Sequence, residues 1–403
     1  MRIICARNES EVAYCGIAVD AGTRDELPGE DGMAHFVEHL SFKGTSRRTS
    51  RQIATRMESV GGDLNAFTGK EETVYYCTTL RQHLARAIEL LLDITLNSIF
   101  PPHEIEREVE VVIDEIESYN DQPSELIYDD FESLLFPDHS LGRNILGSPE
   151  RLRQFRSADM QGFVRRLYHP ERMVLFVYGR VKMDEVVRMV ERISLPASAS
   201  QPFALGSRKG TLPSPQEFGR RLTVSHSTHQ AHVMMGCRTF KATDPRHYAL
   251  YLLNNLLGGP AMSSRLNTSL RERYGLVYSV ESSMVSYTDA GLWCVYFGCD
   301  HHDVKHCERL VMHELKRLCD APLSQRTLDA MRRQMKGQIG IAYDNSESVA
   351  IGMAKRYLHY GTTQTMQQQF ARLDALTPDL LWQTAKELFA PERLFTLAFT
   401  DPV

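Results

Sequence analysis

The sequence predicts an α+β fold made of two duplicated domains, each a mainly antiparallel sheet covered by helices. The first observation is a length of 403 residues, which exceeds that of a usual single domain. The second is that the two halves end on similar segments, YHPERMVLFVYG at 168–179 and FAPERLFTLAFT at 389–400. The third is a stretch between the halves that is rich in Pro, Ser, Gly and Ala, a composition typical of linkers.

This stretch sets the expected domain boundaries. We expect an N-terminal domain over 1–194, a linker over 195–215 and a homologous C-terminal domain over 216–403. An internal duplication is the simplest explanation for two halves that share their closing segments.

The elements expected in each half follow one order. A strand-like segment comes first and a helical segment second, and β-branched and aromatic strands with a pair of long helices complete the half. The last long helix of each half ends alike, on SYND and AYDN. In order, the segments are 13–23, 31–42, 65–80, 82–98 and 103–120 in the first half, and 231–240, 246–259, 275–299, 303–319 and 324–343 in the second. Helices over one face of each sheet would complete such a domain.

Composition excludes several classes of protein. The chain has 46 Lys and Arg against 51 Asp and Glu, a net charge of −5, which gives no bulk attraction for nucleic acid or an anionic membrane. No apolar run reaches the roughly 18 residues of a membrane span. The first residues lack the pattern of a secretory signal, and the eight Cys form no CxxC pair. We therefore expect a cytoplasmic protein with reduced thiols and neither nucleic-acid nor membrane partners.

Residues 35–39 read HFVEH and are the first candidate for chemistry. On a helix, His35 and His39 are one turn apart and face the same way, and Glu38 lies beside both. Two imidazoles with an adjacent carboxylate can supply two zinc ligands and a base. The order is the inverse of the HExxH zinc-peptidase motif.

Zinc in a catalytic site takes a third protein ligand. The helix expected over 101–120 carries Glu108 and Glu115 seven residues apart, so both carboxylates face one way. The alternative for a Glu-rich helix is a solvated face. Val111, Val112 and Ile116 indicate that this helix is packed, so a carboxylate at Glu115 would need a partner.

These segments resemble the inverted-zincin (HxxEH) metallopeptidase family that includes pitrilysin, insulysin and the mitochondrial processing peptidase. In that family a Glu about 76 positions beyond the second His completes the zinc site, and His39 plus 76 is Glu115. The stretches GGDLNAFTGKEETVYY at 61–76 and LGRNILGSPE at 141–150 also match. The resemblance covers essentially the whole chain.

The resemblance implies a zinc endopeptidase that binds one Zn²⁺ per chain through His35, His39 and Glu115. Glu38 would be the general base and Glu108 a supporting acid close to the metal. Asn65 and Ala66 match the strand along which the family lays its peptide substrate. The donor set suits zinc but does not distinguish it from Mn²⁺ or Co²⁺.

The second half carries its own matching segment, GGPAMSSRLNTSLRERYGLVYSV at 258–280. Its Arg271 and Tyr278 correspond to residues that, in the family, contact the substrate or the tetrahedral intermediate. The alternative is a helix N-terminus with an exposed Arg and a core Tyr. Aligned on SYND and AYDN, the positions of Glu108 and Glu115 fall at Arg332 and Ile339, so the second half is not expected to bind the same metal.

In its length and in carrying both sets of residues, the chain resembles the self-sufficient homodimers of the family, so the resemblance implies a homodimer that encloses unfolded peptides. The rival hypotheses are a non-catalytic scaffold and a helper subunit on the same fold, either of which would be marked by loss of a ligand or of the base. Two further His clusters, HSTHQAH at 226–232 and HHDVKHC at 301–307, are interpreted as strand faces and as a solvated helix start.

Overall fold

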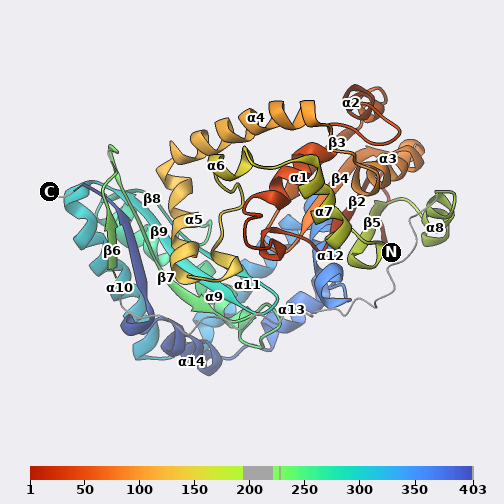
Figure 1. Cartoon of the computed structure of the whole chain (residues 1–403). Helices are drawn as coiled ribbons and strands as arrows, with labels where there is room; N and C mark the ends of the chain where they lie inside the picture. Colours follow the sequence, from red (N-terminus) through yellow and green to blue (C-terminus); the bar gives the residue numbers. More distant parts are fainter. Residues whose placement is uncertain (194–220, 227, 402–403) are drawn as a thin grey trace. The chain divides into compact units, whose positions relative to one another are not determined.

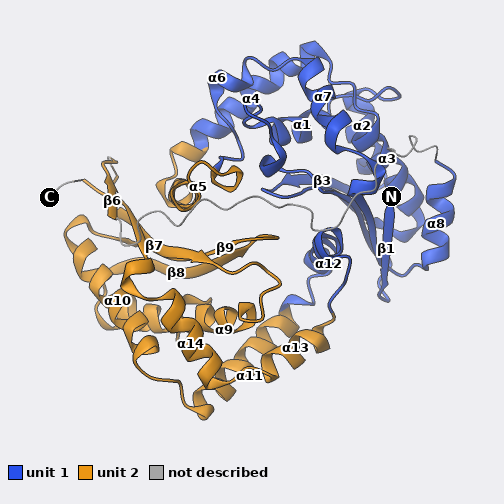
Figure 2. Ribbon diagram, turned by 60° about the horizontal axis from the view of Figure 1, so that its bottom comes forward, with its two compact units in different colours: residues 1–118, 143–207, 342–364 blue, residues 119–142, 208–341, 365–403 orange. Residues whose placement is uncertain are grey.

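The computed structural model describes residues 1–193, 221–226 and 228–401, so the linker expected over 195–215 lies outside the described residues. The chain divides into two compact units, coloured separately in Figure 2. Unit 1 comprises Met1–Ser118, Arg143–Ser207 and Ala342–Gln364, and unit 2 comprises Tyr119–Gly142, Arg208–Ile341 and Thr365–Val403. Whether 1–194 and 216–403 are the folding domains stays a prediction.

The described residues form two five-stranded sheets, one in each unit. In unit 1 the strand order is β1-β5-β2-β4-β3, with β1 and β5 parallel and every other pair antiparallel. In unit 2 the order is β6-β10-β7-β9-β8, again with a single parallel pair, β6 and β10. The strands are β1 (Arg2–Arg7), β2 (Val12–Val19), β3 (Asp63–Thr68), β4 (Thr73–Leu80), β5 (Met173–Gly179), β6 (Arg221–Val224), β7 (Ala231–Thr239), β8 (Val277–Ser286), β9 (Gly291–Cys299) and β10 (Phe395–Phe399).

The two sheets have the same order when each strand of the first half is replaced by its counterpart in the second. The predicted α+β fold with two similar, mainly antiparallel sheets is therefore confirmed. The Pro-Glu-Arg segments begin at Pro170 and Pro391 and lead directly into β5 and β10, the second strand from the edge in each sheet.

The main core of unit 1 lies between one face of its sheet and a layer of helices (Figure 1). Ile88 and Leu91 of α3 belong to this core together with Cys15 and Ile17 of β2, and all four are fully buried. The helices of the unit's first 193 residues are α1 (Met33–Ser41), α2 (Ser50–Glu58), α3 (Leu84–Leu96), α4 (Pro102–Asn120), α6 (Pro149–Leu152), α7 (Ser157–Leu167) and α8 (Met183–Glu191).

The opposite face of the first sheet is covered by α12 (Ser346–Tyr360), a helix from the second half of the sequence. Its buried Ala350, Ala354 and Leu358 pack in one cluster with Val74 and Phe176 of the sheet. Helices were expected on one face only, and the difference arises because this helix belongs to a distant part of the chain.

The second sheet is covered by an equivalent helix, which comes from the first half of the sequence. Ile127 and Phe131 of α5 (Pro123–Leu135), from the first half, share a buried cluster with Met234 and Leu397. Toward the other face, the indole of Trp293 donates a 3.0 Å hydrogen bond to Asn254 of α9. The two halves therefore exchange equivalent helices. The remaining helices of unit 2 are α9 (His247–Gly258), α10 (Val304–Asp320), α11 (Gln325–Ala342), α13 (Met366–Asp374) and α14 (Pro378–Leu388), with a π-helical segment at Asn267–Arg273.

Two further properties of the described residues bear on the expectations above. No helix among them is both long and apolar enough to cross a membrane. All eight cysteines lie within the described residues and all are free thiols.

Candidate metal centre

The HFVEH motif lies on α1, as the sequence predicted (Figure 1). His35 and Glu38 are 7% and 8% exposed, whereas Phe36 and Val37 are fully buried in the core of unit 1. The apolar residues of the motif thus anchor the helix, and the two imidazoles project from its other side, with ring centroids 4.5 Å apart.

The N-terminus of α1 is held by Glu26, a residue that the sequence did not single out. The backbone N–H groups of Gly32 and Ala34 donate to its carboxylate at 3.3 and 2.9 Å. These groups would otherwise lack partners at the start of a helix. Gly32 has a φ of +87° and lies against Gly147, so an added Cβ at Gly32 would approach Gly147 Cα to 2.9 Å. The matching stretch at 141–150 therefore supports the start of α1.

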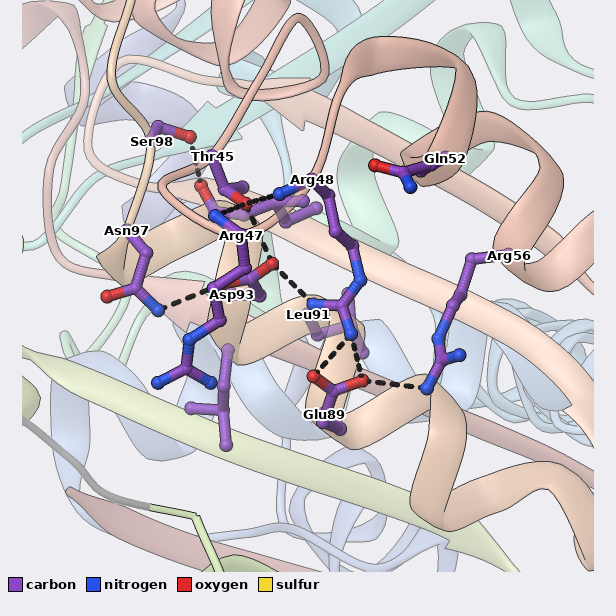
Figure 3. A network of polar contacts seen from close by, with 12 residues as sticks. Thr45, Arg47, Arg48, Gln52, Arg56, Glu89, Leu91, Asp93, Asn97 and Ser98 are labelled. Atoms are coloured by element: carbon purple, nitrogen blue, oxygen red, sulfur yellow. Dashed lines mark hydrogen bonds and ion pairs between the residues drawn. The ribbon is translucent and has the colours of Figure 1, made fainter.

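A polar network holds the segment that follows α1 (Figure 3). Asp93 of α3 is 2% exposed and accepts a 2.9 Å hydrogen bond from the hydroxyl of Thr45. Arg48 forms ion pairs with both Asp93 and Glu89, and Arg56 of α2 binds Glu89 at 3.0 Å. Both ends of the motif helix are thus fixed by tertiary contacts.

The third predicted ligand lies on α4. Glu108 and Glu115 both face α1, as their spacing predicted, but their exposure differs. The side chain of Glu108 is 6% exposed, so the solvated-face alternative is wrong for this residue. The side chain of Glu115 is 44% exposed. Val111 is half exposed, so of the apolar residues cited for packing only Val112 and Ile116 are buried.

The side-chain positions of His35, His39 and Glu115 suit zinc. Glu115 Oε1 lies 3.9 Å from His35 Nε2, and Glu115 Oε2 lies 3.6 Å from His39 Nε2. The three ligand atoms lie within 4.8 Å of one another. Tetrahedral zinc with bonds of about 2.1 Å needs ligand atoms about 3.4 Å apart, which small side-chain rotations would achieve. The donor set of two imidazoles and one carboxylate is that of a catalytic zinc site.

Glu108 orients the ring of His39, one of the candidate ligands. It accepts a 2.9 Å hydrogen bond from His39 Nδ1, which leaves Nε2 directed toward Glu115. Its second oxygen binds the ammonium group of Lys43 at 2.7 Å. A carboxylate behind a metal-binding His is a common arrangement that fixes the tautomer of the ring. In contrast, Nδ1 of His35 has no hydrogen-bond partner among the described residues, so packing alone orients that ring.

The surroundings shift the pKa values of the two imidazoles in opposite directions. Burial, reinforced by the neighbouring His39, lowers the pKa of His35 to about 3, so its ring stays neutral. Burial alone would raise the pKa of Glu108, but the hydrogen bonds from His39 and Lys43 lower it. Burial would lower the pKa of His39, but Glu108 and the charges of Glu38 and Glu115 raise it. A metal at His39 would therefore displace a proton.

Glu38 is the buried carboxylate beside the ligands. Burial raises its pKa, and a hydrogen bond from Thr68 acts in the opposite direction. The Thr68 hydroxyl donates to Glu38 Oε2 at 2.7 Å. Oε1 of Glu38 has no hydrogen-bond partner among the described residues.

Asn65 and Ala66 lie on β3, which is an edge strand of the first sheet. The N–H of Gly69 donates to the carbonyl oxygen of Glu72 across the turn. Along an antiparallel pair of strands, hydrogen-bonded and non-hydrogen-bonded residue pairs alternate. The backbone of Asn65 is therefore hydrogen-bonded to Tyr76, whereas the backbone groups of Ala66 point away from β4. The Asn65 side chain accepts the Ala66 N–H at 3.0 Å. Of these two residues, Ala66 therefore turns its backbone groups to the open edge, where its N–H is bound by the Asn65 side chain.

Arg271 and Tyr278 lie in unit 2, Arg271 in the π-helical segment and Tyr278 at the irregular start of β8. Tyr278 is 64% exposed, which contradicts the core-Tyr alternative. Their approach to the metal centre stays a prediction. Arg332 of α11, the counterpart of Glu108, binds backbone carbonyls of Leu373 and Asp374 instead of a ligand.

The other His clusters belong to unit 2. His302 groups with Asp300 and Asp303, and both His302 and Asp300 are exposed, as expected for a solvated helix start. The expectation of strand faces over 226–232 holds for His232 on β7, whereas His226 and His229 lie outside the strands.

Comparison with known proteins agrees with the motif. The family model described as insulinase (peptidase family M16) matches residues 2–149, and the one described as peptidase M16 inactive domain matches residues 154–335. YmxG of Bacillus subtilis, named an uncharacterized zinc protease, is 32% identical over 403 residues, which are 100% of this chain and 96% of YmxG. The chain belongs to the insulinase family, peptidase family M16. The resemblance inferred from the sequence is thus confirmed.

Other members of the family match over similar lengths. The beta subunit of the mitochondrial-processing peptidase of Saccharomyces cerevisiae is 28% identical, with 97% of this chain and 87% of the subunit covered. The crystal structure of a protease from Helicobacter pylori shares the fold, with a TM-score of 0.89 at 21% identity over 99% of this chain and 96% of that one. The model described as an inactive domain covers the end of the first half and most of the second, up to residue 335.

Proposed function

We propose that this chain is a zinc-dependent endopeptidase that hydrolyses unfolded peptides, with Glu38 as the general base. The observation that carries the proposal is the convergence of His35, His39 and Glu115 around one point, with the buried Glu38 one residue before His39. Membership in peptidase family M16 and the names of the zinc-protease relatives support it.

The residues divide the work as follows. His35, His39 and Glu115 would hold a zinc ion, which would supply Lewis acidity toward a water and a peptide carbonyl. Glu38 accepts a proton on Oε1 and later donates it to the leaving amine. Glu108 binds Nδ1 of His39, so the Nε2 lone pair would be available to the zinc ion.

Substrate binding is proposed at the open edge of β3. An extended peptide can pair with the outward backbone groups of Ala66, a mode in which affinity comes from the main chain and side-chain selectivity is loose. Arg271 and Tyr278 would donate hydrogen bonds to the peptide or to the developing oxyanion.

The proposal includes a homodimer that encloses the substrate and a location in the cytoplasm. One chain carries both the zinc set and the Arg271/Tyr278 pair, so two copies would be self-sufficient, the second unit of one copy facing the zinc of the other. Eight free thiols suit a reducing compartment. Solution scattering of the active protein should give twice the mass of one chain, and an active monomer would contradict the dimer.

The test of activity compares the wild type with Glu38→Gln on an unstructured peptide of 20–30 residues, with fragments followed by mass spectrometry. We expect cleavage by the zinc-loaded wild type, its loss on chelation, and a fall of at least about 100-fold in the variant, because a general base contributes about 10²–10⁴-fold. Glu106→Gln, an exposed position on α4, is the matched control and should cleave normally. Equal cleavage by wild type and Glu38→Gln would sink the assignment of the base, and no cleavage by either would favour a scaffold or helper subunit.

A further inference from the structure

Thr68 makes a direct contact with the proposed base. It is the last residue of β3, and its hydroxyl donates a 2.7 Å hydrogen bond to Oε2 of Glu38. Glu38 is only 8% exposed, so few water molecules compete for that oxygen. A carboxylate with one oxygen fixed has its plane fixed as well, and the other oxygen then has a defined position.

The turn that follows Thr68 is held by buried charges. Residues 69–72 read GKEE, and Lys70, Glu71 and Glu72 are between 5% and 7% exposed. Glu71 forms an ion pair of 2.7 Å with Arg24, in which both side chains are 5% exposed. Charged side chains are rarely this buried unless they are paired.

Helix α12 supplies the remaining anchors of this turn. Glu72 binds Lys355 at 2.6 Å and accepts a 2.9 Å hydrogen bond from His359. Opposite Thr68 in the ladder, the hydroxyl of Thr73 donates to Ala21 O at 2.9 Å. The Thr68 hydroxyl is thus presented to Glu38 from a backbone that is fixed on several sides.

We propose that Thr68 is a positioning residue for the peptidase reaction: its hydroxyl holds Glu38 Oε2 so that Oε1 meets the proton of the attacking water. The inference rests on the proposed function, in which Glu38 is the base. Among the described residues, Thr68 bonds to Glu38 and to none of His35, His39 and Glu115. It should therefore act on the chemical step and leave metal binding unchanged.

Two substitutions separate this role from a structural one. Thr68→Val keeps the β-branched shape and removes the donor, whereas Thr68→Ser keeps the hydroxyl. Thr78→Val is the matched control, because the Thr78 hydroxyl on β4 also donates to a carboxylate, that of Glu347, at 3.1 Å. All three variants are loaded with zinc and assayed on the same unstructured peptide.

We expect Thr68→Val to lower kcat about 10- to 100-fold with KM within about twofold, because misplacing a reacting group by about 1 Å can cost 10²-fold. Thr68→Ser should recover kcat to within about threefold of the wild type, and Thr78→Val should match the wild type. Zinc affinity, measured by competition with a chelator, should be the same in all four proteins. Unchanged kcat in Thr68→Val, or a loss of zinc, would overturn the inference.

A double-mutant cycle tests the contact independently of activity. Urea unfolding of wild type, Thr68→Val, Glu38→Leu and the double variant gives the coupling between the two side chains, because a Leu side chain cannot accept the Thr68 hydrogen bond. We expect the unfolding constants to deviate from additivity by about fivefold, the scale of one hydrogen bond. Additive effects would show that Thr68 does not hold Glu38, even if the protein proved inactive. A wild type that cleaves nothing would instead refute the proposed function, while the cycle would still decide on the contact.

Discussion

At the scale of single residues, the candidate site depends on short spacings along two helices. The i, i+4 spacing of His35 and His39 and the seven-residue spacing of Glu108 and Glu115 each place two side chains on one helix face. The contact between the helices then joins buried Glu108 to His39 and the more exposed Glu115 to both imidazoles. Burial therefore distinguishes Glu108, the proposed supporting acid, from Glu115, the proposed ligand.

The different roles proposed for Glu115 and Glu108 predict that their substitutions lower zinc affinity to different extents. Glu115→Gln should weaken zinc binding more than about 100-fold, because it removes a ligand charge. Glu108→Ala should weaken it about 10- to 100-fold, the usual effect of losing the partner of a ligating His. Zinc affinity measured against a chelator checks both values, with the exposed Glu117→Gln of α4 as the control. A larger loss in Glu108→Ala than in Glu115→Gln would reverse the two assignments.

Local sequence predicted the residues whose positions depend on one helix. His35, Glu38 and His39 follow from helical spacing, and Glu115 follows from the family spacing beyond His39. Glu26 and Thr68 could not be found in this way, because Glu26 reaches α1 through a loop and Thr68 reaches it from a strand 30 positions away. Their contacts exist only after the sheet and helix have packed.

At the scale of elements, the sequence predicted which segments are helices and strands more readily than where they pack. The segment 65–80 contains both β3 and β4, and 275–299 contains β8 and β9. The exchange of α5 and α12 was not predicted, because an amphipathic pattern shows that a helix has a buried face but not which sheet covers it. Each helix lies next in sequence to the elements of its own half and packs on the sheet of the other.

The contacts of α12 with Glu72 predict that the free energy of unfolding depends on pH. Burial would raise the pKa of Glu72, but the hydrogen bond from His359 and the charge of Lys355 hold it at about 2, below the ordinary 4.5. Stability from a lowered carboxyl pKa is present above the unfolded value and is lost as the pH falls toward the folded value. Metal-free Glu72→Gln should therefore lose about 3 kcal/mol of unfolding free energy at pH 7, and less than half of that at pH 3.

Urea unfolding at a series of pH values measures this effect. Glu9→Gln is the control, because the Glu9 side chain is 75% exposed and should change stability little at any pH. A loss in Glu72→Gln that stays constant from pH 7 to pH 3 would show that the lowered pKa does not stabilise the fold.

At the scale of the whole molecule, the two halves share their sheets but differ at the positions of the candidate site. Both sheets keep one strand order, yet the positions of the carboxylates on α4 are occupied by Arg332 and Ile339 on α11. Arg332 binds backbone carbonyls at the end of α13, which is a structural role. The first unit thus retains the candidate metal centre, and the exchanged helices make the stability of each unit depend on both halves of the sequence.

This dependence can be tested with two equal substitutions in the first half of the chain. Phe131 of α5 is 1% exposed in the core of unit 2, and Phe163 of α7 is fully buried in the core of unit 1. Each Phe→Ala change should cost about 3–5 kcal/mol, because it leaves a cavity. Hydrogen exchange read by mass spectrometry should rise first in β7 and β10 for Phe131→Ala, and in β2 and β5 for Phe163→Ala. If both variants raised hydrogen exchange in the first sheet alike, α5 would not stabilise the second sheet. The stability of each sheet would then depend on its own half of the chain alone.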